Sequence, residues 1–84
     1  GSPSYITPQV PVRAGGFKGF CDFCIGDSSL LELKCSGAHS FEAETRWALQ
    51  TSIYAYHLKR STAYWFNINT NQIAQITFNA NHFV

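Results

Sequence analysis

The sequence predicts a single α/β domain that consists of a mixed β-sheet of four to five strands and one main helix. Two segments with alternating apolar and polar residues are joined by a short turn, and a long segment without glycine or proline follows them. The last third contains two aromatic and β-branched segments on either side of an asparagine-rich turn. With 84 residues, of which 45% are hydrophobic, the chain is long enough for one small core.

The first half of the chain is expected to supply three strands. Residues 3–16 carry three prolines and suit an edge strand, where proline is tolerated. Segments 17–25 and 29–36 are predicted to form two strands, because apolar and polar residues alternate in them around a turn at residues 26–29.

The register of these two strands determines where two acidic residues lie. Side chains alternate between the faces of a strand, and the residues expected to share the core face are Cys21, Phe23, Ile25, Leu31, Leu33 and Cys35. The opposite face then carries Asp22 and Glu32. A register that pairs Ile25 with Ser29 places these two acids directly opposite each other, with Cβ atoms about 4.5–5.5 Å apart. At that distance both carboxylates can bind one cation.

A long helix is predicted for residues 41–59. Ser40 is a suitable N-cap. Glu42 and Glu44 lie near the start of the helix and Lys59 lies at its end, which suits the helix dipole. The apolar residues expected to pack on the sheet are Trp47, Leu49, Ile53 and Leu58.

The last third of the chain predicts a hairpin, with strands at residues 62–68 and 72–78 and a turn at 69–71. Residues 79–84 either extend the second strand or form a tail. The aromatic run from Tyr64 to Phe66 favours core and dimer-interface roles over a platform that stacks nucleic-acid bases, because neighbouring strand residues face both ways. The exposed edge of this hairpin is a candidate for sheet extension between subunits, so a homo-oligomer is one expected assembly.

Composition and charge exclude several classes of protein. The formal net charge is +1, so any nucleic-acid contact must come from a local basic patch. No run of about 18 apolar residues is present, so we expect no membrane partner. Three cysteines are an odd number, which favours a reducing, intracellular setting over a secreted disulfide scaffold. Residues 1–2 resemble the remnant of an expression tag, which predicts that residues 3–84 are one domain of a longer protein.

Three short motifs follow one another in these elements. They are Gly19-x-x-Asp22 on a strand, Glu32-x-Lys34 on the next strand and Gln50-x-x-x-Tyr54 on the helix. This series resembles that of the PD-(D/E)XK nuclease superfamily, RecB-type branch, in which the same three motifs occur in this order. The segment 33–37 also resembles the K-T-S segment of that family, with Cys35 where threonine is usual. The resemblance covers residues 10–78 and implies a minimal restriction-endonuclease-like core.

The resemblance implies a metal-dependent nuclease that hydrolyses phosphodiester bonds of DNA, in repair, recombination or replication. Asp22, Glu32 and the carbonyl oxygen of Leu33 would bind Mg²⁺ or Mn²⁺, hard cations that prefer oxygen ligands. Lys34 would orient or help deprotonate the attacking water and offset charge at the phosphate.

Further roles carry over to the helix and to basic or polar residues near the motifs. Gln50 and Tyr54 would complete the catalytic set by holding a metal-site water or a DNA phosphate. Arg46 lies four residues before Gln50, on the same face of the helix, and would contact DNA together with Ser36 and Lys18. The family also has an acidic residue on a helix before the first strand, which we expect a partner subunit or another domain of the parent protein to supply.

Two other functions fit the same sequence. A nuclease fold without activity would serve as a DNA-binding or oligomerisation module and would bind DNA in a salt-sensitive manner without cleaving it. A small zinc-stabilised interaction module would use Cys21, Cys24, Cys35 and His39 as ligands. Residues three apart on a strand face opposite sides, which disfavours Cys21 and Cys24 as ligands of one zinc ion. Ordinary buried cysteines explain the same pattern. Likewise, Glu32-x-Lys34 alone also suits a solvated strand face with a cross-strand ion pair.

Overall fold

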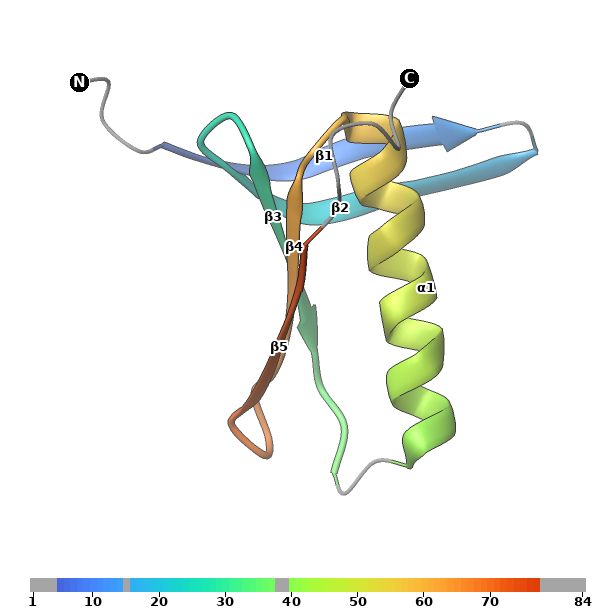
Figure 1. Cartoon of the computed structure of the whole chain (residues 1–84), viewed down its shortest axis with the longest axis vertical. Coiled ribbons are helices and arrows are strands. Elements are labelled where there is room, and N and C mark those ends of the chain that lie inside the picture. Colours follow the sequence, from blue (N-terminus) through green and yellow to red (C-terminus); the bar gives the residue numbers. More distant parts are fainter. Residues whose placement is uncertain (1–4, 15, 38–39, 78–84) are drawn as a thin grey trace.

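The computed structural model describes residues 5–14, 16–37 and 40–77. It contains one helix and a five-stranded mixed sheet (Figure 1), so the predicted fold class is confirmed. The elements are β1 (Ile6–Ala14), β2 (Phe17–Ile25), β3 (Ser29–Lys34), α1 (Phe41–Leu58), β4 (Thr62–Asn67) and β5 (Gln72–Thr77). The expected tag remnant at residues 1–2, the candidate ligand His39 and the segment 79–84 lie outside the described residues.

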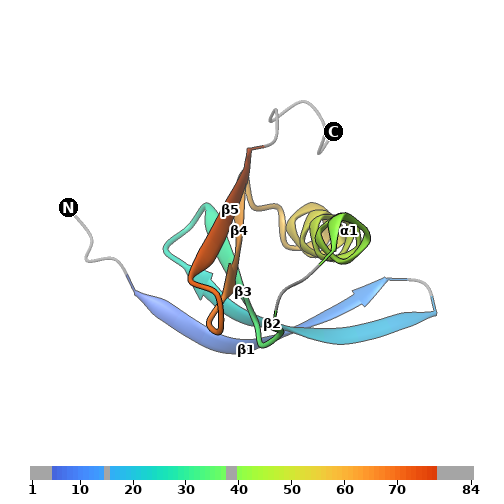
Figure 2. The same cartoon turned by 90° about the horizontal axis from the view of Figure 1, so that it is seen from below.

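The strands lie in the order in which they occur in the chain, β1-β2-β3-β4-β5. Neighbouring strands are antiparallel except β3 and β4, which are parallel. Parallel neighbours need a crossover connection, and α1 makes it. Figure 2 shows α1 in the angle between the strands β3–β5 and the β1–β2 ribbon. Within the described residues, no helix combines the length and the apolar character that a membrane crossing requires.

Both ends of α1 are capped. The Oγ of Ser40 accepts a hydrogen bond from the N–H of Ala43 at 3.2 Å, as predicted for an N-cap. At the other end Lys59 adopts a left-handed conformation with φ of 55°. The N–H groups of Lys59 and Arg60 donate to the carbonyls of Tyr56 and Ala55, at 3.3 and 2.8 Å, which is the Schellman arrangement. The helix therefore ends at Leu58, one residue before the predicted end.

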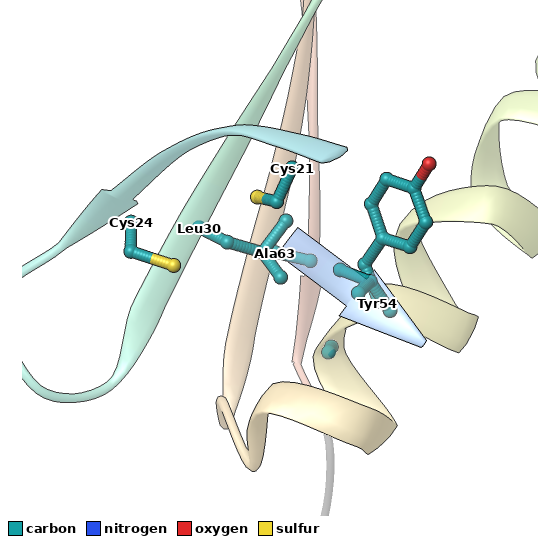
Figure 3. Close-up of a cluster of buried hydrophobic side chains, with 7 residues drawn as sticks. Cys21, Cys24, Leu30, Tyr54 and Ala63 are labelled. Atoms are coloured by element: carbon teal, nitrogen blue, oxygen red, sulfur yellow. The ribbon is translucent and has the colours of Figure 1, made fainter. Parts of the chain in front are cut away.

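At Gln9 and Asp22 the β1–β2 ribbon is irregular. One face of the ribbon packs on the core before this point, and the other face packs on it after this point. Cys21 and Cys24 are both buried in the same apolar cluster, although residues three apart face opposite sides of a regular strand. The ladder pairs Val10 with Cys21 and Pro8 with Phe23 but skips the position between them, where Gln9 has a positive φ of 54°. This irregular step lets both halves of the ribbon contribute to one core (Figure 3).

The core lies on a different face of β3 from the one that the alternation predicted. Leu30 is fully buried and Glu32 is 4% exposed, whereas Leu33 is 40% exposed and Cys35 is exposed. The prediction was wrong because α1 packs on the face of β3 that carries the polar motif residues. The apolar residues of the opposite face are covered only in part.

The helix also turns a different side toward the sheet from the one expected. Thr51, Tyr54 and Ala55 are its buried residues. Leu49 and Ile53, which were expected to pack on the sheet, are 60% and 41% exposed. The inner side of α1 therefore combines a small residue and two residues with hydroxyl groups, and apolar area alone does not identify it.

This burial pattern predicts that two leucines differ strongly in their effect on stability. Leu30→Ala removes a fully buried side chain and is expected to lower the free energy of unfolding by about 2–5 kcal/mol. Leu49→Ala, at an exposed site on α1, is expected to change it by less than about 0.5 kcal/mol. Urea unfolding followed by circular dichroism measures both. Similar losses for the two variants would contradict the observed core.

Candidate functional site

Asp22 and Glu32 lie where strands β2 and β3 separate. The ladder pairs Ile25 with Ser29, Cys24 with Leu30 and Phe23 with Leu31, which confirms the predicted register. At the next position, Asp22 and Glu32, hydrogen bonds from backbone N–H groups to carboxylates replace the bonds between the two backbones. The N–H of Asp22 donates to Glu32 Oε1 at 3.0 Å, and the N–H of Leu33 donates to Asp22 Oδ2 at 2.9 Å. Each carboxylate is thus held by a backbone group of the other strand.

The carboxyl group of Glu32 lies in a largely dry environment. Burial, the largest cause, together with the negative charge of Asp22 raises the pKa of Glu32 from its ordinary value of 4.5 to about 7. The hydrogen bond from the Asp22 N–H and the charge of Lys34 lower this pKa in part. Glu32 therefore exchanges its proton close to neutral pH, and a nearby cation would favour the carboxylate form.

The backbone at Leu33 adds an oxygen to this pair. The N–H and the C=O of a strand residue point to the same side of the strand. Because the N–H of Leu33 points to Asp22, its carbonyl faces the β2 side as well. The carbonyl of Lys34 faces the other way and accepts a hydrogen bond from the N–H of Ile68 at 2.9 Å.

These donors fit a magnesium-like ion better than zinc. Among the described residues, no group of three or more His, Cys, Asp or Glu side chains is arranged to hold a metal ion. Asp22, Glu32 and the Leu33 carbonyl offer oxygen alone. Mg²⁺ is typically bound by one or two carboxylates and keeps several waters, so this incomplete set of hard ligands suits it or Mn²⁺.

A chain of hydrogen bonds joins β3 to the helix. Lys34 Nζ donates to Gln50 Oε1, and Gln50 Nε2 donates to the hydroxyl oxygen of Tyr54 at 3.4 Å. Burial, followed by the charge of Glu32, raises the pKa of Tyr54. In Figure 3 the ring of Tyr54 lies beside the apolar cluster and its hydroxyl points away from it. The fold therefore brings the second and third motifs into direct contact.

The three residues predicted to contact DNA do not all lie close to the Lys34–Gln50 contact. Arg46 is exposed on α1, one turn before Gln50 and about 6 Å along the helix axis. Ser36 follows β3 directly, and its N–H donates to Asn67 Oδ1 at 3.4 Å. Lys18 pairs with Arg13 on the ribbon, four residues and about 13 Å along the strand from Asp22. Arg46 and Ser36 thus lie near the Lys34–Gln50 contact, and Lys18 lies apart from it.

Two tryptophans belong to the site although their sequence context predicted only packing roles. Lys34 Nζ lies 6.0 Å from the centre of the Trp47 ring. That ring meets Trp65 edge-to-face, with centroids 5.1 Å apart. Trp65 pairs with Glu32 in the parallel ladder and is 4% exposed. The three-residue spacing of Trp47 and Gln50, which puts both on one side of a helix, was the available signal.

The cysteines are not arranged as a zinc site in the described part of the chain. Cys21 and Cys24 are buried, while Cys35 is exposed and its Sγ accepts a hydrogen bond from Asn69 Nδ2 at 3.6 Å. Burial and the charge of Glu32 raise the pKa of the Cys21 thiol, which opposes the thiolate form that zinc binding needs. These features favour Cys21 and Cys24 as small buried residues of the core.

Comparisons with known proteins assign no family to this chain. No protein-family model matches it, and neither a curated protein nor a solved structure matches it. Evidence for a function therefore comes from the side chains of the site and from the elements that hold them.

The raised pKa of Glu32 predicts a pH-dependent stability in the absence of divalent metal. Because its pKa is about 7 in the folded chain and 4.5 ordinarily, the folded state holds the proton more tightly. The stabilisation is complete below pH 4.5 and is lost as pH rises through 7. We expect Glu32→Gln to reduce the fall in the free energy of unfolding between pH 5 and pH 8 by up to about 3 kcal/mol. Urea unfolding in the presence of a chelator at these two pH values measures it.

Glu42→Gln is the matched control, since Glu42 is exposed in the first turn of α1. Its unfolding free energy should depend on pH as that of the wild type does. An unchanged pH dependence in Glu32→Gln would show that Glu32 titrates normally.

Proposed function

We propose that this chain is a metal-dependent DNA nuclease domain of the PD-(D/E)XK type, RecB-like branch, that hydrolyses phosphodiester bonds. The observation that carries the proposal is the contact between Lys34 of β3 and Gln50 of α1, beside the paired acids Asp22 and Glu32. Residues from three separate motifs meet in one place, on the face of the sheet that the helix covers. The parallel pairing of β3 with β4 across α1 supports the same proposal.

In this proposal the acidic pair and the Leu33 carbonyl hold Mg²⁺ or Mn²⁺. When bound, the ion would polarise the phosphate and lower the pKa of a bound water. The reciprocal hydrogen bonds between β2 and β3 keep Asp22 and Glu32 at a constant separation. The carboxylates therefore need little rearrangement to accept a cation, which reduces the entropic cost of assembling the site.

Lys34 is the residue proposed to act on the water or the phosphate. Its ammonium group has three donors, and Gln50 Oε1 accepts from one of them. The others can donate to a water or to a phosphate oxygen that enters beside Glu32. Gln50 in turn donates to Tyr54, so the amide cannot rotate without breaking a second hydrogen bond.

Binding of DNA is assigned to local groups, because the net charge is only +1. Arg46 and Ser36 lie near the Lys34–Gln50 contact and are proposed to hold phosphates next to the scissile one. Lys18 would reach only a more distant part of the nucleic acid.

The proposed site takes only two of the five acidic residues of the chain. Asp27 lies in the turn after β2, where Oδ1 accepts from the hydroxyl of Tyr5 at 3.0 Å. Glu42 and Glu44 lie in the first turn of α1. A further acidic ligand, which the resemblance implies, would therefore come from a partner subunit or from another domain of the parent protein.

Metal titration and a cleavage assay test the proposal together. Calorimetry with Mg²⁺ and Mn²⁺ is expected to detect binding to the wild type, weakened at least about tenfold in Asp22→Asn and Glu32→Gln. Lys34→Met is expected to retain metal binding and to lower the rate of cleavage of single- or double-stranded DNA by about 10²-fold or more. Asp27→Asn is the control for loss of a carboxylate outside the site.

The outcomes separate the proposed functions. A folded chain that binds no divalent metal would exclude the catalytic proposal. Salt-sensitive DNA binding without cleavage, under conditions in which metal is bound, would indicate the inactive DNA-binding module instead. Stoichiometric zinc together with unfolding by a chelator would indicate the zinc-stabilised module.

The affinity for Mg²⁺ is also expected to depend on pH. Binding requires the carboxylate form of Glu32, whose pKa is about 7 in the metal-free chain. Below pH 7 the apparent affinity should fall about tenfold per pH unit, and above it the affinity should level off. Calorimetry at pH 6, 7 and 8 measures this change. A pH-independent affinity would mean that Glu32 is not a ligand.

A further inference from the structure

Two aromatic rings lie next to Lys34 and Glu32 without belonging to the three motifs. The chain has two tryptophans, Trp47 on α1 and Trp65 on β4, and their rings meet at 68° with centroids 5.1 Å apart. Trp65 is the parallel-ladder neighbour of Glu32. Ladder neighbours share a face of the sheet, so Trp65 lies on the side of β4 that faces the helix, beside Glu32.

Trp47 contacts the functional group of Lys34. The ammonium nitrogen lies above the indole ring, 6.0 Å from its centre, within the range of a cation–π interaction. Gln50, one turn further along the helix, accepts a hydrogen bond from the same nitrogen. Two neighbouring positions of α1 therefore hold the end of a side chain whose flexible four-carbon stem would otherwise adopt many conformations.

We propose that Trp47 is a positioning residue for Lys34, and that Trp65 holds the Trp47 ring in the orientation this requires. The inference rests on the nuclease function proposed above and names a residue outside its motif series. Trp65 is almost fully buried, so its ring is a rigid support for the edge of Trp47. Because Trp47 acts on Lys34 rather than on DNA, its loss should slow cleavage without weakening substrate binding.

A contact between Trp47 and a base of the substrate is the competing role. Exposed aromatic rings stack on bases of single-stranded nucleic acid, and such a ring would contribute to DNA binding. Trp47 is only half-exposed and already contacts both Trp65 and Lys34. The two roles make opposite predictions for KM and kcat.

The first test measures the position of Lys34 and needs no activity. The side-chain Hε protons of Lys34 should resonate upfield of those of Lys18 and Lys59 in the NMR spectrum, because the adjoining ammonium nitrogen lies over the Trp47 ring. Trp47→Leu should abolish this difference and Trp47→Phe should retain part of it. Tyr56→Leu, which removes an exposed ring from the same helix, should leave it unchanged. Lys34 signals that do not respond to Trp47→Leu would overturn the proposal.

The second test measures cleavage at saturating metal. Trp47→Leu is expected to lower kcat about tenfold, the size of a cation–π contact in a partly dry site, with KM within about twofold. Trp47→Phe should recover most of the rate, and Tyr56→Leu should behave as the wild type. A raised KM with an unchanged kcat would overturn the positioning role in favour of stacking on DNA. Unchanged kinetics in Trp47→Leu would overturn it as well.

The two tests distinguish failure of the nuclease proposal from failure of the positioning proposal. If the folded wild type binds no divalent metal, the nuclease proposal fails, and the NMR comparison still decides whether Trp47 positions Lys34. If Trp47→Leu does not fold, Trp47→Phe keeps an aromatic ring against Trp65 and carries both measurements. A loss of the upfield shift in Trp47→Phe with wild-type kcat would also contradict the proposal.

Discussion

Glu32 is 4% exposed on the face of β3 that α1 covers, and most features of the site follow from this burial. A buried carboxyl group is costly unless it has hydrogen-bond partners. The Asp22 N–H supplies one of them and leaves the β2–β3 ladder at that point. The same burial raises the pKa of Glu32. The pKa values of Tyr54 and Cys21 are raised first by their own burial and then by the charge of Glu32.

This small domain uses much of its interior for polar groups. Thr51 and Asn67 are fully buried. The Thr51 hydroxyl contacts the carbonyls of Trp47 and Ala48 at 2.9 and 3.0 Å, and Asn67 Oδ1 accepts from the N–H groups of Ser36 and Asn69. Natural proteins depart from apolar packing chiefly at functional sites. The buried Asn67, which is the ladder neighbour of Lys34, is consistent with that tendency.

The elements and the register were predictable because their signals are local. The Ser40 cap, the absence of glycine and proline in α1, and the asparagine-rich turn each act over a few residues. The pairing of Ile25 with Ser29 follows from the length of the turn. The site was predictable in part, because Gln50 and Tyr54 lie on one side of any helix that contains both. Their contact with Lys34 depends on which side of the sheet that helix covers.

That choice of side came from the tertiary structure. Alternation places Leu31 and Leu33 on one face of β3 and Leu30 and Glu32 on the other, and hydrophobicity alone favoured the first pair. The crossover from β3 to β4 puts α1 on the second face, where burial is shared among elements distant in sequence. The irregular step at Gln9 and the contact of Trp47 with Lys34 likewise depend on long-range packing. Local periodicity determines which residues share a face, and packing determines which face is buried.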